Sequence, residues 1–136
     1  MPERLNPFSF GSFGYYSQGV KIDLGTKTLI FTAGQLALND DGKPVAPGDF
    51  TAQARFIFGR IQQVLEAAGA SIDDVVKAQF FITDVSKYKE VSAVRNEFFA
   101  NARPATTMVE ISHTVAEGCD IEIEVMAVID NPKGEK

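Results

Sequence analysis

The sequence predicts a two-layer α+β fold with the element order β-β-α-β-α-β-β. Apolar and polar residues alternate with a period of two in five segments, which is typical of half-buried strands. Two longer segments instead repeat apolar residues at helical spacing along one side. Because each helix has a single apolar side, we expect both helices to pack on one face of a mixed sheet of five or six strands.

The first two strands form a predicted N-terminal hairpin. Residues 15–22 and 28–35 alternate in character, around a turn at residues 23–25 that contains glycine. A loop rich in glycine and proline follows over residues 39–48 and leads into the first helix.

The first predicted helix spans residues 51–68. Asp49 or Thr51 can cap its start, and Gly69 supplies the left-handed residue past its end. Its predicted buried side consists of Ala54, Ile57, Ile61, Val64 and Leu65.

A strand over residues 75–83 and a second helix come next. The strand is expected to turn Val76, Ala78, Phe80 and Ile82 to one face. Ser86 is the expected cap of the helix, which runs to about residue 100. One side of this helix carries Tyr88, Val91, Val94, Arg95 and Phe98.

The two C-terminal strands are predicted at residues 104–111 and 121–128. Both alternate with a period of two, and the loop that contains Glu117 and Gly118 would fold them into an antiparallel pair. That pairing predicts one shared face with Thr106, Glu110, Glu122 and Glu124. A face with three carboxylates needs a ligand, a partner subunit or water.

The sheet face without helices is expected to be only partly polar. It is predicted to carry Lys77, Gln79, Phe81, Thr83, Thr106, Met108, Glu110, Glu122, Glu124, Met126 and Val128. This mixture is too apolar for water and too charged for a core, so we expect copies of the same chain to cover it. The alternative is a partly solvated antiparallel sheet.

The length and composition of the chain limit the classes of protein to which it can belong. The 136 residues predict a single domain over residues 1–136. Only one cysteine and one histidine are present, so we expect no disulfide, metal site or cofactor. A net charge of −5 argues against a nucleic-acid partner. Neither a secretory signal nor a membrane span is predicted, so we expect a soluble cytoplasmic protein.

Short motifs along nearly the whole chain resemble the Rid/YjgF family, whose older name is endoribonuclease L-PSP. The motifs are Tyr16-Ser17-Gln18-Gly19, Thr32-Ala33-Gly34-Gln35, the run from Val64 to Ser71, Phe81-Ile82-Thr83-Asp84, Pro104-Ala105, Val109-Glu110-Ile111 and Ile121-Glu122-Ile123-Glu124. The resemblance implies a chorismate-mutase-like fold and a homotrimer with a small-molecule cleft between subunits. For one branch it implies hydrolysis of reactive imines or enamines to ketoacids and ammonia.

The resemblance also indicates the site residues and one departure from the family. Glu122 matches the acidic residue that handles water, and Tyr16 matches an aromatic residue of the cleft. Gly34 and Gln35 could present a backbone N–H and an amide into the cleft, or Gly34 could only permit close approach of the strands. Thr106 stands where the deaminating branch has the arginine that holds the substrate carboxylate. Losing such a charged pair would cost about 2–5 kcal/mol of binding. The nearby Arg103 is expected to point away, because side chains alternate along a strand.

Two functions therefore stay open. One is an imine or enamine hydrolase in which Glu122 is catalytic and Thr106 reflects an altered substrate. The other is a ligand-binding or stress-associated protein without turnover. The ribonuclease activity in the older family name is disfavoured by the negative charge of the chain.

Other candidate residues have simpler structural explanations. Glu110 and Glu124 can form contacts between subunits. His113 and Cys119 could pair as base and nucleophile, but a surface histidine and an incidental thiol are the expected outcome. In the aromatic N-terminal run, Phe13 or Tyr16 could line the cleft, while two further side chains are expected to pack over the sheet edge, namely Phe8 and Phe10.

Overall fold

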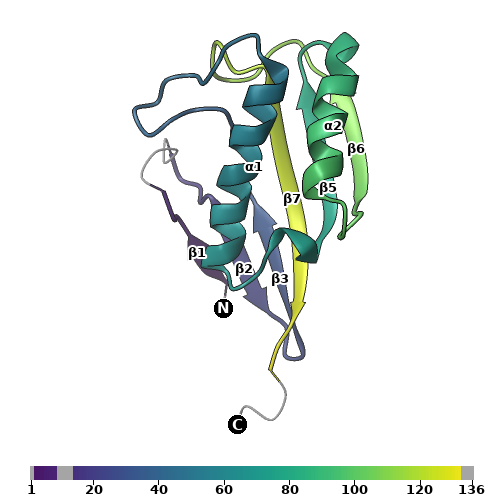
Figure 1. Ribbon diagram of the computed structural model, residues 1–136. Coiled ribbons are helices and arrows are strands. Elements are labelled where there is room, and N and C mark those ends of the chain that lie inside the picture. The colour runs from purple at the N-terminus through teal and green to yellow at the C-terminus, as the bar shows by residue number, and fades with distance from the viewer. Residues whose placement is uncertain (1, 9–13, 133–136) are drawn as a thin grey trace.

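The computed structural model describes residues 2–8 and 14–132, which form a helix layer on a sheet layer (Figure 1). The strands are β1 (Glu3–Leu5), β2 (Gly19–Asp23), β3 (Lys27–Thr32), β4 (Gln35–Leu36), β5 (Val75–Ile82), β6 (Ala105–Glu110) and β7 (Ile121–Asp130). The helices are α1 (Phe50–Ala67) and α2 (Tyr88–Phe98), and two short 3-10 turns are η1 (Ile72–Asp74) and η2 (Val85–Lys87).

Both helices lie on the same face of the sheet (Figure 1). The strand order is β1-β2-β3-β7-β5-β6, and the short β4 adds to β7. Neighbouring strands are antiparallel except β5 and β6, which are parallel. The predicted two-layer α+β fold with a mixed sheet is confirmed, and β1 and β4 extend it. Within residues 2–8 and 14–132, no helix is long and apolar enough to cross a membrane.

The two C-terminal strands are not neighbours, so the predicted antiparallel pair is wrong. β6 lies at an edge and pairs with β5, whereas β7 lies between β3 and β5. Helix α2 explains the difference, because a helical crossover allows the strand after it to run parallel to the strand before it. The loop over residues 111–120 then carries the chain back to the centre of the sheet (Figure 1).

This strand order places Thr106 and Glu122 on opposite faces of the sheet. Residues that pair across neighbouring strands point to the same side. Thr106 pairs with Ala78, which is fully buried beneath the helices. Glu122 pairs with Phe81, three residues further along β5 and therefore on the other side. The predicted face shared by these two residues is wrong.

The other residues expected on that face divide in the same way. Glu124 pairs with Gln79 and stays beside Glu122 on the face without helices. Met108 packs against the core, and Glu110 lies on the same side of β6. The Glu110 carboxylate accepts a hydrogen bond from the Val85 N–H at 2.7 Å, so its contact in the chain is with η2.

Helix α1 supplies the centre of the core. Every residue predicted for its apolar side is buried. Phe58 of α1 stacks on Phe98 of α2 with ring centroids 4.6 Å apart, which joins the two helices. The Asp49 side chain accepts from the Ala52 N–H at 2.9 Å, and Gly69 has φ of +85° past the helix end. The predicted helix stop and the choice of Asp49 as cap are confirmed.

Two local predictions in the next part of the chain are wrong. The turn before α2 is capped by Asp84, whose carboxylate accepts from the N–H and hydroxyl of Ser86 at 3.0 and 2.6 Å. Val76 is 45% exposed and Val75 is buried in its place. The cause is a shift in the pairing of β5 with β7 between Val75 and Lys77, which interrupts the alternation.

A buried glutamine ties α1 to the loop before β7. Gln53 is fully buried, and its Nε2 donates to the carbonyls of Ala46 and Gly118 and to the Asp120 carboxylate, at 3.3, 2.9 and 3.1 Å. Its Oε1 accepts from the Asp120 N–H at 2.8 Å. Both ends of the amide are therefore used, and they fix the start of the strand that carries Glu122.

Candidate functional site

The side chain of Glu122 lies directly over Gly34. A Cβ atom built on Gly34 would be 2.0 Å from Glu122 Oε2, a distance at which two atoms overlap. Gly34 stands in the two-residue break between β3 and β4, where the chain leaves one pairing with β7 and begins another. Glycine at this position thus makes room for a carboxyl group, and the structure brings these two predicted site residues together.

The environment of Glu122 favours its protonated form. The side chain is half-buried on β7, and this burial raises its pKa above the ordinary glutamate value. The negative charge of Glu124, two residues along the same face, raises the pKa further. A carboxyl group that keeps its proton to a higher pH can give a proton as well as accept one.

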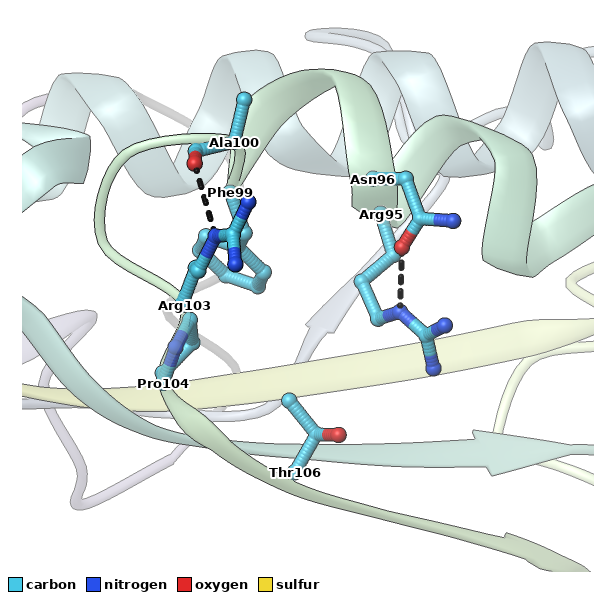
Figure 2. Close-up of a pocket in the computed structure, with 7 residues that line it drawn as sticks. All are labelled: Arg95, Asn96, Phe99, Ala100, Arg103, Pro104 and Thr106. Carbon is cyan, nitrogen blue, oxygen red and sulfur yellow. Dashed lines mark hydrogen bonds between the residues drawn. The ribbon is translucent and has the colours of Figure 1, made fainter.

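Thr106 lines a pocket on the opposite side of the sheet. The pocket has a volume of about 390 Å³ and lies between the end of α2 and the start of β6. Figure 2 shows its lining, which consists of Arg95, Asn96, Phe99, Ala100, Arg103, Pro104 and Thr106. A single chain therefore presents the Thr106 pocket and the Glu122 carboxyl on different surfaces.

Arg103 shares this pocket with Thr106, so the prediction that it points away is wrong. Arg103 precedes β6 and has φ of +47°, in the left-handed region. Strand alternation does not apply there. The Arg103 Nε donates to the carbonyl of Ala100 at 3.3 Å, which holds the side chain near the end of α2 (Figure 2).

Arg95 is a pocket residue that the sequence did not single out as functional. The sequence predicts Arg95 on the same side of the second helix as Val91 and Val94. Its half-exposed side chain lines the pocket, and its Nε donates to Asn96 Oδ1 at 3.1 Å (Figure 2). Arg95 lies in the last turn of α2, and Thr106 lies near the start of β6, the next strand along the chain. This short separation along the chain is the signal that could have identified Arg95 as a pocket residue.

Neither Gln35 nor Tyr16 lies beside the Glu122 carboxyl or in the pocket that Thr106 lines. Gln35 is buried and pairs with Ile123 on the helix side, and its amide donates to the carbonyl of Ala33 at 3.2 Å. The Gln35 amide therefore lies on the other side of the sheet from Glu122, and its place in a cleft stays a prediction. Tyr16 is 48% exposed and lines a separate pocket of about 370 Å³ with residues 4, 14, 15 and 17.

The cysteine and histidine have separate neighbours. Cys119 is buried with its thiol 3.6 Å from the carbonyl of Ala37. Burial raises its pKa, as do the charges of Asp120 and Glu122, so the thiol is a poor nucleophile. His113 is an exposed loop residue whose Nδ1 lies 3.1 Å from the carbonyl of Thr114.

Of the aromatic N-terminal run, Phe10 and Phe13 lie outside the described residues. Phe8 is half-buried, and the guanidinium of Arg60 lies 4.4 Å from its ring centroid. Arg60 also stacks over Phe56 and donates to Asp40 at 2.7 Å. Phe8 thus packs on a side chain of α1, a structural contact.

Comparison with known proteins gives a consistent result. A family model described as endoribonuclease L-PSP matches residues 9–129. A 2-iminobutanoate/2-iminopropanoate deaminase of Escherichia coli K12 is 38% identical over 120 residues, which cover 86% of this chain and 89% of that protein. A RutC family protein of Pyrococcus abyssi is 32% identical over 115 residues, which cover 85% of each chain.

A solved structure shows the same fold. The Rid-family protein YyfA of Yersinia pestis, described as a protein of unknown function, matches with a TM-score of 0.83 at 29% identity. The match covers 95% of this chain and 100% of that chain.

Proposed function

This chain belongs to the endoribonuclease L-PSP family, also called the Rid/YjgF family, and on that premise we propose that it hydrolyses a small imine or enamine. The deaminase of Escherichia coli, a relative at 38% identity, gives the reaction class. The resemblance implies that Thr106 stands where the deaminating branch has an arginine, which is the reason to expect an altered substrate.

The observation that carries the proposal is the Glu122 carboxyl against Gly34. In imine hydrolysis a water oxygen bonds to the carbon of the C=N group, the C–N bond then breaks, and the nitrogen leaves as ammonia. The water must lose protons and the nitrogen must gain them. A half-buried carboxyl with a raised pKa suits both transfers, and the close approach over Gly34 holds it in one place.

We propose that the site forms between copies of the chain in a homotrimer. The face that carries Glu122 also presents half-buried Phe81, Met126 and Val128, which favours its coverage by another copy. The Thr106 pocket at the edge strand β6 of one copy can then face Glu122 of the next. The opposite orientations of Thr106 and Glu122 support this arrangement, because one chain by itself cannot surround a ligand with both.

A second candidate function is binding of a small molecule without turnover, and the threonine at position 106 favours it. At position 106 a threonine hydroxyl offers one neutral hydrogen bond where a guanidinium would offer a charged fork. A protein that binds a small molecule in the same cleft without turnover would tolerate this change. The two functions differ in one measurable property, the release of ammonia.

The test is ammonia release from freshly generated imines, namely 2-iminobutanoate and neutral imines of similar size, compared with buffer. The wild-type protein should accelerate hydrolysis of a neutral or differently charged imine and show little or no acceleration with 2-iminobutanoate. Glu122→Gln should reduce the acceleration by about 100-fold or more, in the range of a general acid–base contribution. Glu124→Gln, which removes a carboxylate from the same face of the same strand, should retain activity. No acceleration by the wild type, or equal rates for wild type and Glu122→Gln, would contradict the proposed role.

A further inference from the structure

The chain forms a β-bulge between β3 and β4, beside the strand that carries Glu122 (Figure 1). Phe31 pairs with Met126 at the end of β3, and Gln35 pairs with Ile123 at the start of β4. Four residue steps from Phe31 to Gln35 therefore face only three steps from Met126 to Ile123. The extra residue interrupts the alternation of side chains on this strand.

The bulge turns Thr32 and Gly34 to opposite faces of the sheet. Thr32 is 8% exposed and pairs with Gly19 on the helix side, where a Cβ on that glycine would meet Val64 of α1. The atoms nearest to a Cβ on Gly34 instead belong to Glu122, on the face without helices. Residues two apart in a regular strand would share one face. The bulge is therefore what directs Gly34 toward the carboxyl group.

The Thr32 side chain supplies a hydrogen bond at the bulge. Val125 lies on β7 between the residues that pair with β3 and those that pair with β4. Its buried N–H donates to the hydroxyl oxygen of Thr32 at 3.0 Å, so a side chain accepts where a regular ladder would use a backbone carbonyl. A buried N–H without an acceptor costs free energy, and this hydroxyl thus stabilises the bulge.

The residue between Thr32 and Gly34 is held at both of its polar groups. The Ala33 N–H donates to the carbonyl of Gln18 at 2.9 Å, and the Ala33 carbonyl accepts from the Gln35 amide at 3.2 Å. Together with the bond from Thr32 to β7, these contacts fix the chain on both sides of Gly34.

We propose that Thr32 is a positioning residue for the Glu122 carboxyl. Its hydroxyl holds the bulge against Val125, and the bulge keeps Gly34 against the carboxyl, which stays half-buried in one place. This inference rests on the proposed function of Glu122 in proton transfer. Without the hydroxyl, the Val125 N–H would have to find water or another acceptor, which would move the bulge and let the carboxyl turn toward solvent.

Three variants test the hydroxyl of Thr32. Thr32→Val keeps a side chain of similar shape and removes the acceptor, whereas Thr32→Ser keeps the acceptor and removes a methyl group. Thr28→Val is the matched control, because Thr28 is buried on the same face at the other end of β3. Its hydroxyl donates to Asn131 at 2.6 Å, so this variant also loses a hydroxyl hydrogen bond but far from Glu122.

Carbon-13 NMR of the full-length protein measures the titration of Glu122 without any substrate. In the wild type, burial and the charge of Glu124 raise the pKa of this carboxyl. In Thr32→Val we expect the pKa to fall toward the ordinary glutamate value, because the carboxyl becomes better hydrated. Amide exchange at Val125 should become about tenfold faster or more. Thr32→Ser and Thr28→Val should keep the wild-type pKa of Glu122 and the wild-type exchange at Val125.

Turnover is the second measurement. With 2-iminobutanamide, a neutral imine, Thr32→Val should lower kcat by about tenfold, because the proton-transferring group is no longer held in place. KM should change by less than about twofold, since Thr32 lies on the helix side and does not contact the substrate. Thr32→Ser and Thr28→Val should stay within about twofold of the wild type in both constants.

The outcomes distinguish this inference from the proposed hydrolase. A Glu122 pKa that falls in Thr32→Val alone, without ammonia release by the wild type, would support the positioning role and contradict the hydrolase. Ammonia release by the wild type, with an unchanged kcat and Glu122 pKa in Thr32→Val, would support the hydrolase and overturn the positioning role. An equal fall of the pKa in Thr28→Val would also overturn it. So would a fall in Thr32→Ser, a result that decides the question even if Thr32→Val does not fold.

Discussion

The Glu122 carboxyl occupies the space that a side chain on Gly34 would need, with Oε2 only 2.0 Å from the position of a Cβ atom. Gly34 lies in the break between β3 and β4, and Glu122 lies on β7, which is far away in the sequence. The position of the proposed catalytic group therefore depends on the absence of one methyl group.

Gly34→Ala should separate activity from stability. The added methyl pushes the flexible end of Glu122 aside, so we expect at least a tenfold loss of activity with a modest change in unfolding free energy, about 1–2 kcal/mol. Gly59→Ala, in α1 with nothing within 4 Å of the added atom, should instead stabilise by about 0.5–1 kcal/mol. Imine hydrolysis and urea unfolding measure both. Full activity in Gly34→Ala would show that the position of Glu122 is unimportant.

The pH dependence of stability should reveal the half-buried carboxyl of Glu122. Its pKa in the folded protein is raised above the ordinary value of 4.5, so the folded state binds the proton more tightly than the unfolded state. Stability should therefore fall as pH rises from the ordinary value to the raised one, and stay level above it. Glu122→Gln removes this loss.

The measurement is the melting temperature of wild type and Glu122→Gln from pH 3 to pH 8. The melting temperature of Glu122→Gln should rise relative to that of the wild type as pH increases from the ordinary pKa of glutamate to the raised one. Above the raised pKa, the difference in melting temperature should stay constant. Glu124→Gln should move the window to lower pH, because the Glu124 charge contributes to the raised pKa. An advantage of Glu122→Gln that is independent of pH would contradict the assignment.

Gln53→Leu should destabilise the whole fold. The substitution keeps the side-chain size but removes the buried partners of the Ala46 and Gly118 carbonyls and of the Asp120 N–H. We expect a loss of about 2–4 kcal/mol in urea unfolding, the cost of several unsatisfied buried polar groups. Gln63→Leu, at an exposed position of α1, should change stability by less than about 0.5 kcal/mol and serves as the control.

Assembly should respond to a charge on the face that carries Glu122. Met126 pairs with Lys77 on that face and is half-buried in one chain. Met126→Lys would bury an unpaired ion in the proposed trimer, so we expect dissociation that light scattering can detect. Ala93→Lys, on the exposed side of α2, should leave the trimer intact. A wild-type mass of 14.8 kDa at micromolar concentration would contradict the trimer itself.

Much of the fold follows from periodicity within single elements. The apolar repeat of α1, its Asp49 cap and the glycine past its end are local signals, and all three are confirmed. The alternation of β7 likewise places Glu122 and Glu124 on one face. Each of these features depends on neighbours within a few residues along the chain.

Periodicity within single strands could not show that Thr106 and Glu122 lie on opposite faces of the sheet. Alternation gives two sides to each strand, but hydrogen-bond register and strand order decide which sides coincide. An assumed hairpin of the last two strands put both residues on one face, and the insertion of β5 between those strands reversed the outcome. The side-chain alternation of a strand does not predict the direction of Arg103, because its left-handed backbone conformation interrupts the alternation just before β6.

In the proposed trimer, the opposite orientations of Thr106 and Glu122 would allow two defective proteins to repair each other. A subunit whose pocket is blocked by Thr106→Trp would keep an intact Glu122 face, and a Glu122→Gln subunit would keep an intact pocket beside Thr106. A proposed trimer that contained both would have a cleft in which the intact pocket of one subunit meets the intact carboxyl of the other. Subunits mixed during refolding would then regain activity that neither parent has, as genetic complementation within one assembly.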